Sequence, residues 1–349
     1  MKTHFLGWDI GGAHLKAACL NTTGEILQVL QQPCPLWKGL PYLQQAIQSI
    51  LLRMPRQDYR HIVTMTGELA DCFSSREQGV AAILQTMAAE LPDSEIVVFA
   101  GNKGFLPLDQ VQSHHTLFIA SANWLASAQL AAKHWQHGLF VDIGSTTTDI
   151  LLLENFAVQT QGQTDFHRLI SGELVYTGII RTSVMSVAQQ AEFMDQTMGL
   201  MAEHFATMAD VYRLIGDLKP AHDQSETADG MEKTPQASAR RLSRLTGYEF
   251  SEQDWPIWLS FALEIKRQQK QRILNACLQQ LSRRSHSTNQ LGLIGAGVGR
   301  FLAREIAQEL GLVYHDFNDL FPRATTAGEI DAADCAPAAA VAYLAACLG

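Results

Sequence analysis

The feature that most constrains this chain is a short strand-and-turn motif that occurs twice. Residues 7–16 read Gly-Trp-Asp-Ile-Gly-Gly-Ala-His-Leu-Lys, and residues 138–149 read Gly-Leu-Phe-Val-Asp-Ile-Gly-Ser-Thr-Thr-Thr-Asp. In each, an apolar strand ends in Asp-Ile-Gly and then turns through small residues. A third glycine run, at 293–299, reads Leu-Ile-Gly-Ala-Gly-Val-Gly. Two matching turns and one distant glycine turn favour two related lobes that grip a phosphorylated ligand between them.

The composition is that of a globular protein with about two domains. The chain has 349 residues, of which 47% are hydrophobic, so sizeable cores are expected. The formal net charge is −9, and there is no basic stripe of the kind that binds nucleic acid. Apolar stretches are interrupted before the roughly 18 positions that a membrane span needs. We therefore expect neither nucleic acid nor a membrane as a partner.

The cysteines and the first residues favour a cytoplasmic protein. Six cysteines occur, and none forms a Cys-x-x-Cys pair, so they are expected to be reduced thiols rather than disulfides or zinc ligands. The first residues lead directly into a strand, so no signal peptide is expected.

Alternation and helical spacing predict an α/β pattern in residues 1–136, the first predicted lobe. The expected elements are strands at 5–10, 15–20, 25–31, 61–66 and 96–100 and helices at 41–54, 76–91 and 121–135. Ser75 is expected to cap the second of these helices, with Gln78 completing a capping box.

The same pattern returns in residues 137–349, the second predicted lobe, where Asp142 stands 133 positions after Asp9. Strands are expected at 139–143, 149–153, 157–161, 291–294 and 312–316, and helices at 298–310 and 337–347. A mostly helical insertion is expected at about 172–284, and its polar part, 216–247, is typical of a loop or mobile cover. The predicted fold is α/β, with two actin-like (ribonuclease H-like) lobes and a cleft between them.

Small residues and hydroxyl groups in both turns favour an anion site. Glycine lets the backbone bring N–H groups close to a phosphate, and serine and threonine add hydroxyl donors. The carboxylates of Asp9 and Asp142 are better suited to hold a hydrated Mg²⁺ ion that neutralises the phosphates. The predicted phosphate-binding residues are Gly11, Gly12, Ala13, Lys16, Gly144, Ser145, Thr146 and Thr147. Tight hairpins without a ligand are the alternative for each turn.

Acidic residues at a strand end are candidates for proton transfer. The segment Thr-Met-Thr-Gly-Glu-Leu-Ala-Asp at 64–71 leaves an expected strand, where open α/β sheets often bind ligands. Glu68 or Asp71 could take a proton from a hydroxyl group, or either could simply mark a helix N-terminus. With Asp9 and Asp142 they form the predicted catalytic set.

A further group of residues is expected to contact a nucleoside or another substrate. Glycines after a strand can expose N–H groups at a helix start, although close packing without a ligand explains them equally well. Acids, an amide and an arginine near the motifs could contact substrate, or could cap helices and lie on the surface. The candidates are Asn123, Glu173, Arg181, Asp229, Gly295, Gly297 and Gly299.

Taken together, the motifs resemble those of the actin, sugar kinase and Hsp70 (ASKHA) superfamily, and more narrowly its hydantoinase A/oxoprolinase-related branch. Within that branch the chain is similar to the tetrahydromethanopterin-linked one-carbon transfer proteins of methanogens and methylotrophs. The segments that carry the resemblance are 8–16, 64–71, 120–124, 142–149, 227–230 and 295–299.

The resemblance implies a transferase of methanofuran or methylofuran biosynthesis. Its archaeal members imply that an aminomethylfuran methyl diphosphate is joined to γ-glutamyltyramine, with formation of an aryl ether and release of diphosphate. The implied cofactor is Mg²⁺, which would stabilise the departing charge. Glu68 or Asp71 would then serve as the base, with no covalent enzyme intermediate.

Other functions remain open at this point. Most of the superfamily binds ATP, so an ATP-dependent kinase or ligase is the first alternative. An actin-like nucleotide-binding partner or activator protein is the second, and a hydantoin- or oxoproline-cleaving amidohydrolase is the third, although such enzymes generally need a second, larger subunit or domain. The expected partner is a small phosphorylated substrate, and a homodimer is left open.

Overall fold

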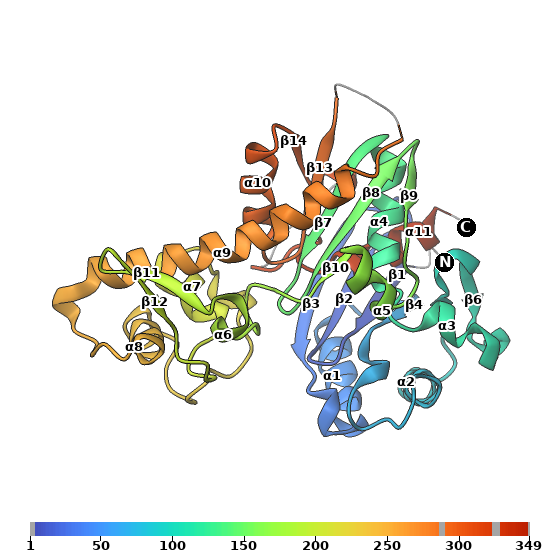
Figure 1. Cartoon of the computed structure of the whole chain (residues 1–349). Coiled ribbons are helices and arrows are strands. Elements are labelled where there is room, and N and C mark those ends of the chain that lie inside the picture. The colour runs from blue at the N-terminus through green and yellow to red at the C-terminus, as the bar shows by residue number, and fades with distance from the viewer. Residues whose placement is uncertain (1–3, 286–289, 323–328, 348–349) are drawn as a thin grey trace. The chain divides into compact units, whose positions relative to one another are not determined.

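The computed structural model describes residues 4–285, 290–322 and 329–347, and the chain divides into two compact units (Figure 1). The first unit comprises Met1–His137, Leu153–His167 and His315–Gly349, and the second comprises Gly138–Leu152 and Arg168–Tyr314. These units differ from the lobes expected at 1–136 and 137–349, because two later segments join the first unit.

The first unit contains a six-stranded sheet in the order β3-β2-β1-β4-β5-β6. Its strands are β1 (His4–Ile10), β2 (His14–Leu20), β3 (Ile26–Pro33), β4 (Tyr59–Met65), β5 (Glu95–Phe99) and β6 (Phe105–Pro107). Strands β1, β2 and β3 form an antiparallel meander, whereas β1, β4 and β5 run parallel. The meander expected from the sequence is confirmed, and it places Asp9 beside the carboxyl end of β4.

Helices complete the first unit, and the last of them explains why the C-terminal segment belongs here. They are α1 (Leu40–Arg53), α2 (Arg76–Glu90), α3 (Thr116–Ile119), α4 (Asn123–His134) and α11 (Ala336–Ala346), while α5 (Asp165–Ser171) begins here. Helix α11 is almost entirely apolar and packs on β1. Gly7 permits this packing, since a Cβ atom there would lie 2.0 Å from the Ala338 carbonyl oxygen. Ser75 caps α2 as expected, with its Oγ accepting from the Gln78 N–H at 3.1 Å, but the Gln78 side chain accepts from the Ser74 N–H at 2.6 Å, so the expected capping box is not completed.

The second unit has a sheet in the order β10-β8-β7-β13-β14. Its strands are β7 (His137–Ile143), β8 (Thr148–Glu154), β10 (Leu174–Val175), β13 (Gly292–Ala296) and β14 (Val313–Asp316), and α10 (Arg300–Glu309) follows β13; the short strand β9 spans Ala157–Gln159. Strand β7 is parallel to β13, as β1 is to β4. The expected α/β fold, with one sheet for each copy of the motif, is confirmed.

The insertion in the second unit is mostly helical, as expected. It contains α6 (Val184–Val187), the hairpin β11 (Gln190–Phe193) and β12 (Gln196–Gly199), α7 (Met208–Ile215), α8 (Pro235–Thr246) and the long α9 (Trp255–Leu281). Its core includes Tyr212, Trp258 and Phe261, which are almost fully buried. Within the described residues, no helix is long and apolar enough to cross a membrane.

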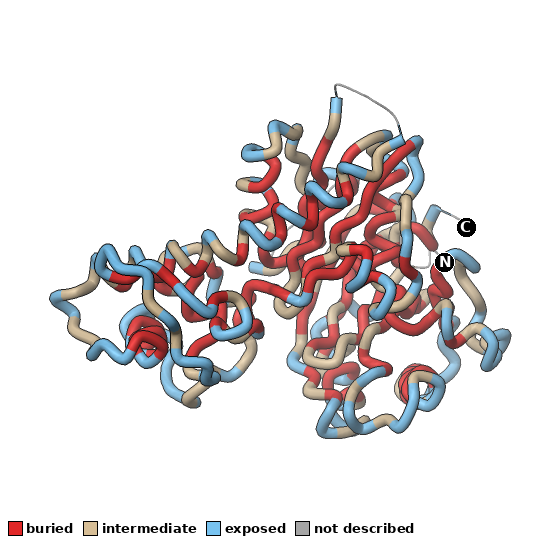
Figure 2. Tube along the Cα trace, viewed as in Figure 1, coloured by how far each residue is buried: buried red, intermediate tan, exposed pale blue. Residues whose placement is uncertain are grey.

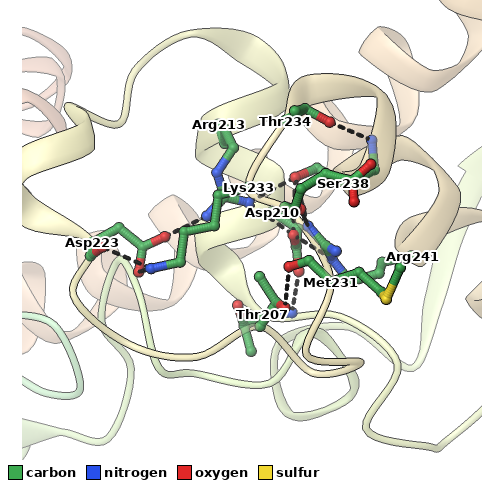
Figure 3. A network of polar contacts seen from close by, with 12 residues as sticks. Thr207, Asp210, Arg213, Asp223, Met231, Lys233, Thr234, Ser238 and Arg241 are labelled. Atoms are coloured by element: carbon green, nitrogen blue, oxygen red, sulfur yellow. Dashed lines mark hydrogen bonds and ion pairs between the residues drawn. The ribbon is translucent and has the colours of Figure 1, made fainter.

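The expectation of a loop over 216–247 is wrong for its second half, where α8 lies. The Thr234 side chain caps this helix, and one face of it is buried (Figure 2). Ion pairs make this possible, because the buried Arg241 contacts Asp210 at 2.8 Å (Figure 3). It also contacts the partly exposed Asp229 at 3.0 Å. Arg213 pairs with Asp210 as well. Polar residues that satisfy one another can fill a core, although their composition is typical of a loop.

A buried histidine in the first sheet gives a test of the fold by pH. Trp8 Nε1 donates to His61 Nδ1 at 3.0 Å, and burial lowers the pKa of His61 to about 4 from an ordinary 6.5. The unfolded chain therefore binds a proton more readily than the folded chain between these values. We expect unfolding free energy to fall by about 3 kcal/mol as pH falls from 6.5 to 4 on account of His61.

Urea unfolding across this pH range checks the prediction. The matched variant is His61→Asn, whose amide oxygen can accept from Trp8 but does not titrate. The difference between wild type and variant should shrink as the pH falls, since the variant lacks this loss. A difference that stays constant from pH 7 to pH 4 would contradict the assignment.

Candidate active site

The first glycine turn is fixed by backbone bonds that leave N–H groups open. Gly11 N–H donates to the His14 carbonyl at 3.0 Å, and the carbonyls of Gly12 and Ala13 accept from backbone N–H groups at 3.0 and 2.8 Å. In the part of the chain that the structure describes, the N–H groups of Gly12 and Ala13 donate to no other group. A Cβ atom at Gly12 would meet open space. These features suit the binding of an anion.

Asp9 ends β1 beside this turn and is held by an amide. Asn123 Nδ2 donates to Asp9 Oδ1 at 3.1 Å, while Asn123 Oδ1 accepts from the Trp124 N–H at 2.7 Å. Asn123 is the first residue of α4, and the N-cap is Ala122 without a side-chain cap bond, so the helix-cap alternative for Asn123 is wrong. Its contact with substrate stays a prediction. Lys16 is the antiparallel partner of Asp9 and donates to the Asp334 carbonyl at 2.9 Å.

Glu68 lies next to the same turn because its short helix packs against it. Thr66 N–H donates to the Ile10 carbonyl at 3.0 Å, and a Cβ atom at Gly67 would lie 3.1 Å from that oxygen. The 3₁₀ helix η2 (Gly67–Leu69) then buries Glu68 completely. Asp71, three residues later, is exposed. Of the two predicted bases, Glu68 is the one that the fold holds at the turn.

The environment of Glu68 favours a protonated carboxyl group. Burial raises its pKa, although the hydroxyl of Ser121 and the charge of Arg76 act in the opposite direction. Ser121 Oγ lies 2.7 Å from Glu68 Oε1, and Oε2 has no hydrogen-bond partner among the described residues. A carboxyl group with a raised pKa and one unpartnered oxygen is suited to exchange a proton with a ligand.

The second turn repeats the first one in the other unit. Gly144 N–H donates to the Thr147 carbonyl at 2.9 Å, as Gly11 does to His14. Asp142, near the end of β7, is largely buried. The segment after β10 packs tightly on it, because a Cβ atom at Gly178 would lie 2.4 Å from the Thr146 nitrogen. The Ser145 carbonyl accepts from two backbone N–H groups of this segment, at 3.1 and 2.8 Å. The turn is therefore built on a preformed support.

The third glycine run packs against this second turn. Gly297 has a φ of +81°, and a Cβ atom there would lie 2.3 Å from Asp142 Oδ1. Gly299 N–H donates to the Ile143 carbonyl at 2.8 Å, and Gly295 leaves no room for a Cβ atom beside Tyr314. Close packing thus accounts for these three glycines, and their contact with a nucleoside stays a prediction.

The remaining predicted contacts differ in what their side chains already bind. Glu173 is fully buried and paired with Arg283 at 3.2 Å. Asp229 is bonded to Arg241; burial alone would raise its pKa, but the Met231 N–H and nearby arginines lower it overall. Arg181 is exposed, and its Nη1 lies 3.5 Å from Thr146 Oγ1. Of these, Arg181 is the best placed to meet an anion at the second turn.

Several residues of these sites carry no signal in the sequence. Ser121 and Asp165 contact each other at 3.3 Å, although 44 positions separate them. Gln269 in α9 donates to the Thr177 hydroxyl and the Gly178 carbonyl, which supports the second turn from the insertion. One clue to the contact between Ser121 and Asp165 was present in the sequence, which is that Ser121 lies two residues before the predicted site residue Asn123.

No cluster of three or more histidine, cysteine or acidic side chains placed to hold a metal ion occurs within 4–285, 290–322 and 329–347. Carboxylate oxygens such as those of Asp9 and Asp142 suit Mg²⁺, which usually keeps several waters and needs few protein ligands. The two aspartates belong to different units, so their sharing of one ion stays a prediction.

Comparison with known proteins identifies the family. The hydantoinase/oxoprolinase model matches residues 60–318, which is well over half of the chain. This chain belongs to the hydantoinase/oxoprolinase family. A relative in Methanocaldococcus jannaschii, named (4-{4-[2-(gamma-L-glutamylamino)ethyl]phenoxymethyl}furan-2-yl)methanamine synthase, is 31% identical over 246 residues, covering 70% of this chain and 72% of the relative. A synthase of the same name in Methanococcus vannielii is 23% identical over 172 residues, covering 49% and 75%.

Solved structures of other members of the fold are also similar to this one. A nucleotide-free acetone carboxylase aligns with a TM-score of 0.50 at 10% identity, over 89% of this chain and 68% of that one. Component A of the Acidaminococcus fermentans (R)-2-hydroxyglutaryl-CoA dehydratase aligns over 99% of both chains, with a TM-score of 0.47 and 14% identity. The first of these likenesses supports the family's fold and says nothing of substrate.

Proposed function

We propose that this family member is a synthase of methanofuran or methylofuran biosynthesis. It joins the phenol oxygen of γ-glutamyltyramine to the methylene carbon of an aminomethylfuran methyl diphosphate, and diphosphate leaves. The observation that carries the proposal is the 31% identity to a synthase of this ether product over 72% of that relative. The residues around the first turn supply the groups that such a reaction requires.

Each group at the first turn has a role in this reaction. The N–H groups of Gly12 and Ala13 and the ammonium of Lys16 bind the diphosphate, since all are donors beside one turn. Asp9, oriented by Asn123, is the residue that would hold Mg²⁺ in this unit, and the ion supplies neutralisation of charge on the leaving diphosphate. Glu68 accepts the proton of the phenol at Oε2, which is buried and has no hydrogen-bond partner among the described residues.

The second turn is a further anion site in the proposal. Its Ser145, Thr146 and Thr147 resemble the first turn in geometry, and Arg181 adds a charge beside Thr146. Asp142 is the residue that would hold an ion in the second unit. We also propose a cytoplasmic location, which suits the six free cysteines.

Product analysis tests the function directly. The protein is incubated with γ-glutamyltyramine, the furan diphosphate and Mg²⁺, and the mass of the ether and the released diphosphate are measured. One diphosphate per ether is expected, without ATP. Absence of the ether, together with turnover of ATP, would favour the kinase or ligase alternative.

A thermal-shift panel separates the alternatives at the level of binding. Diphosphate with Mg²⁺ should raise the melting temperature, and adenine should not be required. A shift with ATP and ADP alone would favour the nucleotide-dependent functions, including the activator protein, over the synthase.

A further inference from the structure

One serine hydroxyl of the first unit lies between two carboxyl groups. Ser121 Oγ is 2.7 Å from Glu68 Oε1 and 3.3 Å from Asp165 Oδ2. Arg76 Nη2 lies 3.5 Å from the same oxygen of Asp165. The four side chains thus form a chain of polar contacts that begins at the buried Glu68 and ends at the partly exposed pair of Asp165 and Arg76.

Few protons are available to this series of polar contacts. A serine hydroxyl carries one hydrogen and can donate it to one acceptor at a time. If Ser121 donates to Asp165, then Glu68 must bring its own proton to share with Ser121 Oγ. Glu68 is fully buried, whereas the Asp165 side chain is 30% exposed and paired with Arg76. Burial therefore places the proton on Glu68 and the negative charge on Asp165.

Close packing holds Glu68, the buried end of this series of polar contacts, in place. A Cβ atom at Gly79 of α2 would lie 2.2 Å from the Glu68 carbonyl oxygen, so only glycine allows this approach. The same helix carries Arg76 one turn earlier. Ser121 has a φ of +49°, a conformation that is strained for a residue with a side chain. The strained backbone at Ser121 holds its hydroxyl group between the carboxyl groups of Glu68 and Asp165.

We propose that Glu68, Ser121 and Asp165 form a proton relay, which carries the phenolic proton away from the acceptor substrate. This inference rests on the proposed function and deepens it. Glu68 is the group that touches the substrate, and Ser121 and Asp165 are positioning residues that act through it. Arg76 holds the end of the relay next to Asp165.

The reaction conserves protons and electron pairs. In one concerted shift, the Ser121 proton passes to Asp165 Oδ2 and then to water, the proton on Glu68 Oε1 passes to Ser121 Oγ, and the phenol proton passes to Glu68 Oε2, so that Glu68 carries one proton throughout. The electron pair of the phenol oxygen forms the new C–O bond to the furan methylene. The bond from that carbon to diphosphate breaks, and diphosphate leaves with its electron pair.

The test removes the middle of the relay without disturbing the fold. Ser121→Gly removes the hydroxyl and tolerates the positive φ, and Ser121→Ala gives a second variant without the hydroxyl. We expect a fall in kcat of about 10- to 100-fold with little change in KM, and a shift of the acidic limb of the pH–rate profile. Asp165→Asn should have the same effect. Glu77→Gln, an exposed carboxyl on the same helix as Arg76, is the control and should match wild type.

Two further readouts separate a relay from a structural role. A ring-fluorinated γ-glutamyltyramine, whose phenol is more acidic, should recover most of the rate lost in Ser121→Gly. Infrared difference spectra at pH 7 should show a protonated carboxyl band that disappears in Glu68→Gln and shifts in Ser121→Gly.

The outcomes distinguish the relay from the function on which it rests. If wild type forms the ether but Ser121→Gly and Asp165→Asn keep its rate and pH profile, the relay is overturned and the function stands. If wild type forms no ether, the proposed function is overturned. The infrared band then decides alone: its absence overturns the relay, and a band that shifts in Ser121→Gly supports the proton chain.

Discussion

Replacing Glu68 by glutamine should lower kcat for ether formation by about 10²- to 10⁴-fold, the range that general bases contribute. Glutamine keeps the shape of the side chain and can still donate an amide N–H to Ser121 Oγ, but it cannot take a proton from the phenol. Steady-state kinetics with product detection by mass measures the effect. Binding of diphosphate, followed by thermal shift, should change little because the N–H groups of the first turn remain.

Chemical rescue provides the control for this prediction. Glu68→Ala leaves space where the carboxyl was, so added formate should restore part of the rate. A change in folding alone would not respond to formate. A Glu68→Gln variant that retains half or more of the wild-type rate would contradict the role of Glu68 as base.

Replacing Arg241 by methionine should destabilise the second unit by about 3–5 kcal/mol. Arg241 is fully buried and bonds Asp210 (Figure 3). It also bonds Asp229 and the Glu232 carbonyl. Its loss leaves two carboxylates short of their main partner inside the insertion. Urea unfolding monitored by tryptophan fluorescence measures the change, since Trp258 lies in the core of this unit.

Arg244→Met is the matched control for this prediction. Arg244 lies on the same helix and faces the same Asp229 at 3.6 Å, but its side chain is 45% exposed. An exposed pair of this kind contributes roughly 0–1 kcal/mol. Equal losses in the two variants would show that burial of the network does not decide its strength.

Local patterns were sufficient for the strands and turns. Each copy of Asp-Ile-Gly follows an apolar run and precedes small residues, so the sequence places a carboxylate at the end of β1 and β7 without reference to the rest of the chain. Glu68 was predicted in the same way, as an acid just beyond β4. These features depend on neighbours within a few residues, which a sequence displays.

Long-range contacts decided what those residues can do. The sequence did not separate Glu68 from Asp71, because burial of the first by α2 depends on close packing at Gly79. Glu173 and Asp229 were predicted as substrate contacts. In the fold, Glu173 is paired with Arg283, and Asp229 is paired with Arg241.

The sequence by itself determined the repeated turns and the two sheets, because glycine and alternating apolar residues act through local geometry. Only the tertiary structure brought Ser121 and Asp165 to Glu68 and placed α11 on β1. It also folded the second half of the polar segment 216–247 into helix α8. The physical reason is that burial sets the charge of a carboxyl group, and burial comes from segments that lie far apart along the chain.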